Sequence, residues 1–117
     1  MSDLVEHRPR PVTPDGRYFV AGGRLFRKSN PALTPEERKR LTFELIAARS
    51  AAMHARRRQD AAASAAALDR VTAAKTALGQ SGPPWWADAA PDLSRQPARG
   101  TTYADWFSRL APHEVER

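Results

Sequence analysis

The side chains best suited to chemistry in this chain are its arginines and lysines, and most of them lie in the N-terminal half. The 117 residues include 19 Lys and Arg against 13 Asp and Glu, a net charge of +6. Residues 1–58 hold 13 of these cations and 6 of the carboxylates, whereas residues 59–117 hold 6 and 7. A one-sided basic excess is typical of a surface that meets a polyanion, although small basic proteins also carry it as a solvated surface.

The cations that we expect to contact nucleic-acid phosphates come from a proline-rich N-terminal stretch, a predicted β-hairpin and the end of a predicted helix. They are Arg8, Arg10, Arg24, Arg27, Lys28, Arg56, Arg57 and Arg58. No DNA-reading motif accompanies them, so we expect contacts mainly to phosphates with little sequence selectivity. The alternative for the last three is that they complement the negative C-terminal end of the helix dipole.

A second candidate site is the aromatic pair Trp85-Trp86. Successive side chains of an extended segment point in opposite directions, so both rings cannot face the core. We expect one Trp to pack on the alanine-rich helices and the other to meet a base or a partner protein. The alternative function is therefore a protein-interaction adaptor that uses this segment or an exposed helix face.

Sequence motifs for catalysis and for metal binding are missing. The chain has no cysteine, and His7, His54 and His113 lack the spacing of metal ligands. Gly22-Gly23 lacks the further residues of a phosphate-binding loop, and no serine or threonine stands in a nucleophile motif. We expect a binding protein that is not an enzyme and uses no metal or cofactor.

Two antiparallel helices are predicted over residues 34–79. Thr34-Pro35-Glu36-Glu37 combines an N-cap threonine, proline at the first helical position and a glutamate that completes a capping box. The first helix is expected over residues 35–58, and Asp60 is expected to cap the second, which Gly79 follows. The predicted apolar stripe of the first helix consists of Leu41, Leu45, Ala48, Ala52 and Ala55.

A small β-hairpin is predicted over residues 17–28, because Gly22-Gly23 suits a two-residue turn between two apolar runs. Residues 1–16 before it are expected to form an extended or flexible arm, since they are rich in proline. The facing pairs of the hairpin are then Val20 with Leu25 and Phe19 with Phe26.

Residues 80–117 are predicted to wrap over these elements as an aromatic segment with one short helix. Thr102-Tyr103-Ala104-Asp105 resembles a capping box and is expected to open that helix, which Pro112 ends. Its apolar residues are Trp106, Phe107 and Leu110. The fold expected for residues 1–117 is a single, mainly α domain with a long α-hairpin.

We expect a cytoplasmic protein with no membrane contact. The first seven residues contain no apolar run of the kind found in a secretory signal. The longest uncharged helical stretch, residues 61–68, is too short to cross a bilayer. The small side chains of the second helix favour self-association as a four-helix homodimer, unless the β-hairpin and tryptophans complete the core within one chain.

Two stretches together resemble a known family. They are residues 8–31, which include Arg8-Pro9-Arg10-Pro11 and Gly23-Arg24-Leu25-Phe26, and Trp85-Trp86 with the later Tyr103-Ala104-Asp105-Trp106. They are similar to short, uncharacterised bacterial proteins that are sometimes labelled Tol-type biopolymer transporters. The resemblance covers most of the chain and implies no catalytic residues.

Overall fold

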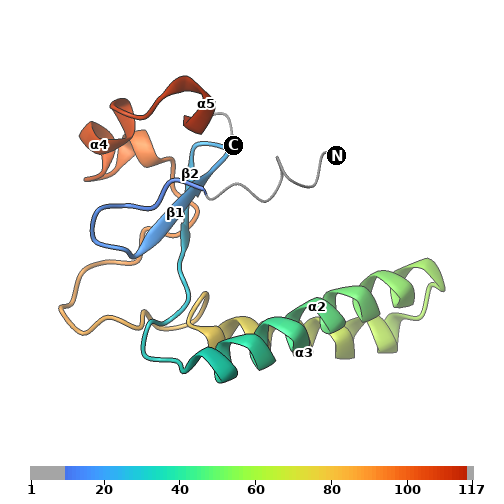
Figure 1. The fold of residues 1–117 in the computed structure, drawn as a ribbon. Helices are drawn as coiled ribbons and strands as arrows, with labels where there is room; N and C mark the ends of the chain where they lie inside the picture. Colours follow the sequence, from blue (N-terminus) through green and yellow to red (C-terminus); the bar gives the residue numbers. More distant parts are fainter. Residues whose placement is uncertain (1–9, 116–117) are drawn as a thin grey trace. The chain divides into compact units, whose positions relative to one another are not determined.

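The computed structural model describes residues 10–115, which divide into two compact units (Figure 1). The first unit combines residues 10–28 with residues 90–115, and the second is Ser29–Ala89. The predicted elements are confirmed: a small N-terminal β-hairpin, a long α-hairpin and a C-terminal segment with short helices. The single domain expected over residues 1–117 stays a prediction.

A two-stranded antiparallel hairpin lies at the centre of the first unit. Its strands are β1 (Tyr18–Ala21) and β2 (Arg24–Arg27). Gly22 and Gly23 join them with φ angles of 58° and 76°, the positive values that a two-residue hairpin turn requires. The predicted register is confirmed, because Val20 faces Leu25 and Phe19 faces Phe26.

The outer edge of β1 is paired with the N-terminal stretch. The backbone N–H of Val20 donates to the Pro11 carbonyl at 2.9 Å, and that of Thr13 donates to the Tyr18 carbonyl at 2.9 Å. Residues 11–13 of the predicted arm are therefore extended and held to the sheet, and a turn over residues 14–17 connects them to β1.

The outer edge of β2 is paired with a segment far along the chain. The N–H of Leu25 donates to the Gln96 carbonyl at 3.0 Å, and the N–H of Ala98 donates to the Gly23 carbonyl at 2.8 Å. Both edges of the hairpin are thus occupied within the first unit, which prevents either strand from adding a further strand along most of its length.

The two faces of the hairpin differ in burial, because side chains alternate along each strand. Tyr18, Val20 and Leu25 share one face, and each is at most 1% exposed. The Tyr103 ring covers this face, edge-on to Tyr18 with the ring centroids 5.7 Å apart. The C-terminal segment of the same unit therefore supplies the packing that an isolated hairpin lacks.

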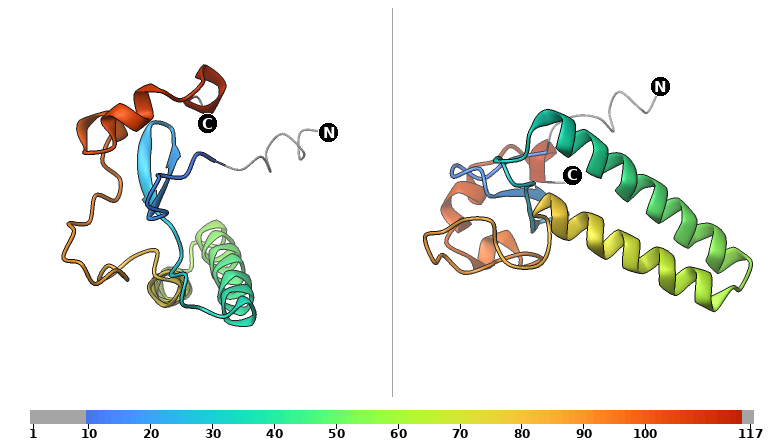
Figure 2. Two further views of the ribbon diagram at one scale, coloured as in Figure 1. Left: turned by 60° about the vertical axis from the view of Figure 1, so that its left-hand side comes forward. Right: turned by 90° about the horizontal axis from the view of Figure 1, so that it is seen from below.

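The second unit is built on two antiparallel helices, α2 (Pro35–Arg57) and α3 (Ala61–Leu78), which lie side by side (Figure 2). The predicted capping box is confirmed: Glu37 N–H donates to the Thr34 hydroxyl at 3.1 Å, and Thr34 N–H donates to the Glu37 carboxylate at 2.9 Å. Asp60 caps α3 as predicted, by accepting from the third residue of the helix.

The contact between α2 and α3 is made mostly of small side chains. The buried residues of the two helices are Leu45, Ala48, Ala55, Ala67, Ala74 and Leu78. Leu33, Leu41 and Val71 pack against the buried leucines at the end of the hairpin opposite the turn. The predicted stripe on α2 is therefore confirmed, and alanine alone fills the contact near the turn.

The capping predicted for the C-terminal helix is wrong. Helix α4 (Ala104–Ser108) has Tyr103 at its N-cap, without a side-chain cap. The Thr101 hydroxyl, not Thr102, accepts from the Tyr103 N–H at 3.2 Å, and it donates to the Ala98 carbonyl at 2.8 Å. A 3₁₀ turn, η1 (Ala98–Gly100), precedes this threonine and shifts the start of the helix by one residue.

The expectation that Pro112 ends this helix is also wrong, because α4 already ends at Ser108. Pro112 instead begins a further short helix, α5 (Pro112–Val115), whose Glu114 carboxylate accepts from the N–H of the preceding Ala111 at 2.9 Å. Proline suits the first turn of a helix, because the N–H that it lacks would have no helical partner there.

We predict that Gly79→Ala lowers the free energy of unfolding by about 1 to 3 kcal/mol. Gly79 has a φ of 85°, and an added Cβ would lie 3.0 Å from the Asn30 Cβ and 3.1 Å from the Trp85 Cδ1. Urea unfolding followed by circular dichroism measures the loss. The matched control is Gly100→Ala, where a Cβ meets nothing within 4 Å. Equal losses in the two variants would contradict the prediction.

Candidate nucleic-acid interface

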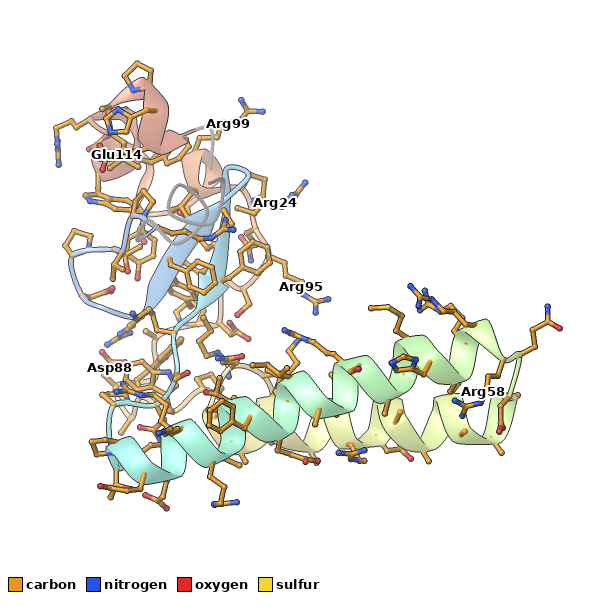
Figure 3. All side chains as sticks on the ribbon, turned by 45° about the vertical axis from the view of Figure 1, so that its right-hand side comes forward. Arg24, Arg58, Asp88, Arg95, Arg99 and Glu114 are labelled. Atoms are coloured by element: carbon orange, nitrogen blue, oxygen red, sulfur yellow. The ribbon has the colours of Figure 1, made fainter. Side chains whose placement is uncertain are left out.

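The eight cations predicted to contact phosphates are divided between the two units. Arg8 lies outside the described residues. Arg10, Arg24 and Lys28 are exposed in the first unit. Arg56, Arg57 and Arg58 are exposed where α2 ends, and Figure 3 shows Arg58 beside the turn between the two helices.

The prediction for Arg27 is wrong. Its side chain is 1% exposed, and its Nη2 lies 2.6 Å from the Asp92 Oδ2. Arg27 follows Leu25 by two residues on β2, so the alternation of the strand turns both toward the core. A guanidinium in this position is buried against the Asp92 carboxylate and does not reach a phosphate.

Two arginines that the sequence did not single out lie close to Arg24. The segment paired with β2 carries Arg95, and η1, which follows it, carries Arg99. The Arg24 guanidinium donates to the Arg95 carbonyl at 2.8 Å. Figure 3 shows the side chains of all three residues along one side of the first unit. We refer to Arg24, Arg95 and Arg99 as the arginine patch.

A local irregularity of the pairing gives Arg95 its place in the patch. The carbonyl of Leu25 accepts from the Arg95 N–H at 2.6 Å, while the N–H of Leu25 donates to Gln96. Arg95 and Gln96 therefore both lie opposite Leu25, as in a β-bulge, and Arg95 has a φ of 70°. Bulges change the direction of the side chains that they carry, and the backbone of Arg95 differs in this way from that of a regular strand.

The charge of the first unit is unbalanced around the arginine patch. Its described residues include eight Lys and Arg and four Asp and Glu. Two of these carboxylates, Asp15 and Asp92, are engaged with partners near the buried face. Within residues 10–115, no carboxylate pairs with an arginine of the patch. The patch therefore presents positive charge that an anion could neutralise.

The carboxyl groups of Asp15 and Asp92 have lowered pKa values. Partial burial by itself would raise the pKa of Asp92, but hydrogen bonds from Ser94 and Arg27 favour the charged form and outweigh burial. Burial likewise opposes the shift at Asp15, whose pKa is lowered by hydrogen bonds from Tyr103, Thr13 and Arg17. Both side chains are therefore carboxylates over the whole neutral range.

A cavity of about 630 Å³ lies in the first unit beside two tyrosines. Burial, followed by the neighbouring Asp15, raises the pKa of Tyr103, and burial also raises that of Tyr18. The Tyr103 hydroxyl donates to Asp15 at 2.6 Å, and the Tyr18 hydroxyl accepts from the Leu93 N–H at 2.9 Å. The phenols are protonated and internally hydrogen-bonded, which suits a structural role.

The tryptophan pair belongs to the second unit. Trp85 and Trp86 are both half-buried, and their rings meet edge to face with the centroids 5.1 Å apart. Trp85 also lies against Gly79 at the end of α3. Because both side chains are half-buried, their exposure does not divide them into one core ring and one binding ring.

Comparison with models of protein families, with characterised proteins and with solved structures finds no match to this chain. The resemblance to a bacterial family stays a prediction. In the described part of the chain, no three His, Asp or Glu side chains are grouped so that they could hold a metal ion. None of its helices has the length and apolar character that a membrane crossing requires.

We predict that acid destabilises the first unit through Asp15 and Asp92. A carboxyl whose pKa is lowered by folding stabilises the protein above its ordinary pKa of 3.8, and that contribution is lost as the pH falls through the lowered value. The variant Asp15→Asn/Asp92→Asn should be less stable at neutral pH and respond less to acid. Urea midpoints read from the amide resonances of Val20 and Leu25 measure this.

The control for this prediction is Asp105→Asn. Asp105 is an exposed carboxylate in the first turn of α4. This variant removes a negative charge from the same unit without touching either network. If it changes the acid response as much as the double variant does, the hydrogen-bonded carboxylates of Asp15 and Asp92 are not the source of that response.

Proposed function

We propose that this protein is a non-enzymatic nucleic-acid-binding protein that contacts phosphates through the arginine patch. The observation that supports this most is that pairing of the β2 edge gathers Arg24, Arg95 and Arg99, which are all exposed. These residues come from two segments about 70 positions apart in the sequence.

Arginine suits this function because its planar guanidinium can donate two parallel hydrogen bonds to one phosphate. A patch of three such groups, without facing carboxylates in the described part of the chain, gains affinity by releasing counterions from the nucleic acid. Contacts of this kind position a protein on the backbone and carry little sequence information. The resulting binding is weakly sequence-selective and strongly dependent on salt.

We predict that Arg24→Gln/Arg95→Gln/Arg99→Gln weakens binding to a labelled oligonucleotide and flattens its salt dependence. For each phosphate that the variant no longer binds, the slope of log K against log salt should fall by about 0.9 on duplex DNA or about 0.7 on single strands. Fluorescence anisotropy between about 50 and 200 mM salt measures both quantities. Circular dichroism shows whether the variant is folded.

A charge-matched control is Arg56→Gln/Arg57→Gln/Arg58→Gln. It removes the same charge from the end of α2, where these residues also favour the helix terminus. We expect a smaller loss of affinity from this variant, together with some loss of helix stability. Equal effects of the two triple variants would mean that binding follows net charge alone. Absence of binding by the wild type at low salt would contradict the proposed function.

A second candidate function, protein interaction, is favoured by the exposed face of α2. Phe43, Ile46 and Met53 are 59%, 57% and 52% exposed, and their spacing of three and seven residues places them on one stripe of the helix. Large apolar side chains in such a stripe are typical of a surface that packs against another helix.

The partner that we propose for this stripe is a second copy of the chain, with the two α2 helices antiparallel. Acidic residues occupy the first turn of α2 and basic residues its last turn. An antiparallel pair therefore brings opposite charges together at both ends while the apolar stripes meet between them.

We predict that Ile46→Glu/Met53→Glu abolishes self-association, because it buries charge at the centre of the expected contact. Sedimentation equilibrium over a wide concentration range should show a concentration-dependent dimer for the wild type and a monomer for this variant. Leu68→Glu on α3, a residue 49% exposed, is the control and should leave the dimer intact. A monomeric wild type at every concentration would contradict the dimer.

A further inference from the structure

We propose that the nucleic acid bound by this protein is single-stranded, and that Phe19 and Phe26 provide the surface on which its bases stack. This inference rests on the proposed function and adds a second recognition element to the arginine patch. The two phenylalanines face each other across β1 and β2. Their rings are stacked, with centroids 5.7 Å apart and an angle of 26° between the planes.

The position of this pair on the sheet distinguishes it from the core. Phe19 and Phe26 lie on the face opposite Tyr18, Val20 and Leu25, and both are half-buried, so part of each side chain is open to solvent. The core of the first unit forms on the other face, so these rings are not needed to fill it. Aromatic rings on neighbouring strands of a sheet are a common surface for the stacking of unpaired bases.

The charge beside the pair favours a nucleic acid as its partner. Arg24 precedes Phe26 by two residues on β2, and the alternation of the strand places the two side chains on one face. Two residues of a strand span about 7 Å, which a long arginine side chain can bridge toward the phosphate of a stacked nucleotide. The segment that carries the rest of the arginine patch is hydrogen-bonded to the edge of the same strand.

Single strands fit this surface better than a duplex does. The bases of a duplex are stacked on each other and hidden from an aromatic side chain, whereas those of a single strand can turn outward. Because both hairpin edges are already paired, a peptide partner has little free backbone to pair with as an added strand. The partly exposed aromatic face with arginines beside it remains, and these are the components of single-strand binding surfaces.

The experiment compares a labelled oligothymidylate of about 12 nucleotides with a duplex of the same length, by fluorescence anisotropy. The wild type should bind the single strand more tightly. Phe19→Leu/Phe26→Leu keeps apolar side chains on the strands but removes the rings, so it should weaken single-strand binding about fivefold or more for each base that no longer stacks and leave duplex binding almost unchanged. Phe43→Leu is the control, since Phe43 is exposed and has the Lys39 Nζ 5.9 Å from its ring centre.

A second measurement does not depend on the stability of the variant. In the wild-type protein, the ring-proton resonances of Phe19 and Phe26 should move upfield when the oligothymidylate is added, while those of Phe43 stay in place. Upfield movement confined to the hairpin rings supports the inference.

The possible failures are distinguishable. Duplex binding equal to or tighter than single-strand binding overturns the inference and leaves the proposed function intact. The inference is also overturned, with the proposed function intact, if the ring resonances of Phe19 and Phe26 do not move. The same conclusion follows if the hairpin variant and the Phe43 control lose equal affinity for the single strand. If neither nucleic acid binds at low salt, both the proposed function and the inference are wrong.

Discussion

The pairing of the β2 edge with the segment after Leu93 is the interaction on which the first unit depends. A two-stranded hairpin is only marginally stable in water, so it needs a third partner. The backbone of Leu25 supplies it by bonding to both Arg95 and Gln96. The same pairing closes the core over Tyr18 and aligns Asp92 with Arg27. Without it, neither the buried face nor the arginine patch would exist.

Arg27 and Asp92 also fix how the strands align. A shift of β2 by one residue relative to its neighbours would exchange the two faces of the strand. It would expose Leu25 and remove the Arg27 guanidinium from the carboxylate that neutralises it. An arginine buried without such a carboxylate is very costly, so alternative registers are disfavoured by charge as well as by apolar burial.

Local signals predicted most of the fold. The helix caps and the hairpin turn act through backbone groups only a few residues away, so the neighbouring sequence is sufficient to predict them. The caps are Thr34 with Glu37 and Asp60, and the turn is Gly22-Gly23. The same approach failed at the C-terminal helix, which follows a 3₁₀ turn and begins after Tyr103 without the side-chain cap expected from Thr102.

The candidate site was less accessible to prediction, because it is made by contacts between distant residues. Nothing near Arg95 or Arg99 in the sequence indicates that they meet Arg24, which lies 71 positions before the first of them. Arg27 resembled a surface cation at the end of a strand, and only its partner Asp92 shows why it is buried. Strand alternation alone could have indicated that Arg27 is buried, since its side chain lies on the same face of β2 as that of the apolar Leu25.

The alanine-filled contact between α2 and α3 makes the α-hairpin unequal along its length. Leucines are buried together toward the end opposite the turn, which we call the base, whereas Ala55 and Ala67 are the buried residues nearest the turn. Separating alanines exposes little apolar area, so opening from the turn requires less free energy than opening from the base. Alanine also favours helix without tertiary contacts. The helices can therefore part near Asp60 while each keeps its backbone hydrogen bonds, and amide exchange there would report separation of the helices more than their unfolding.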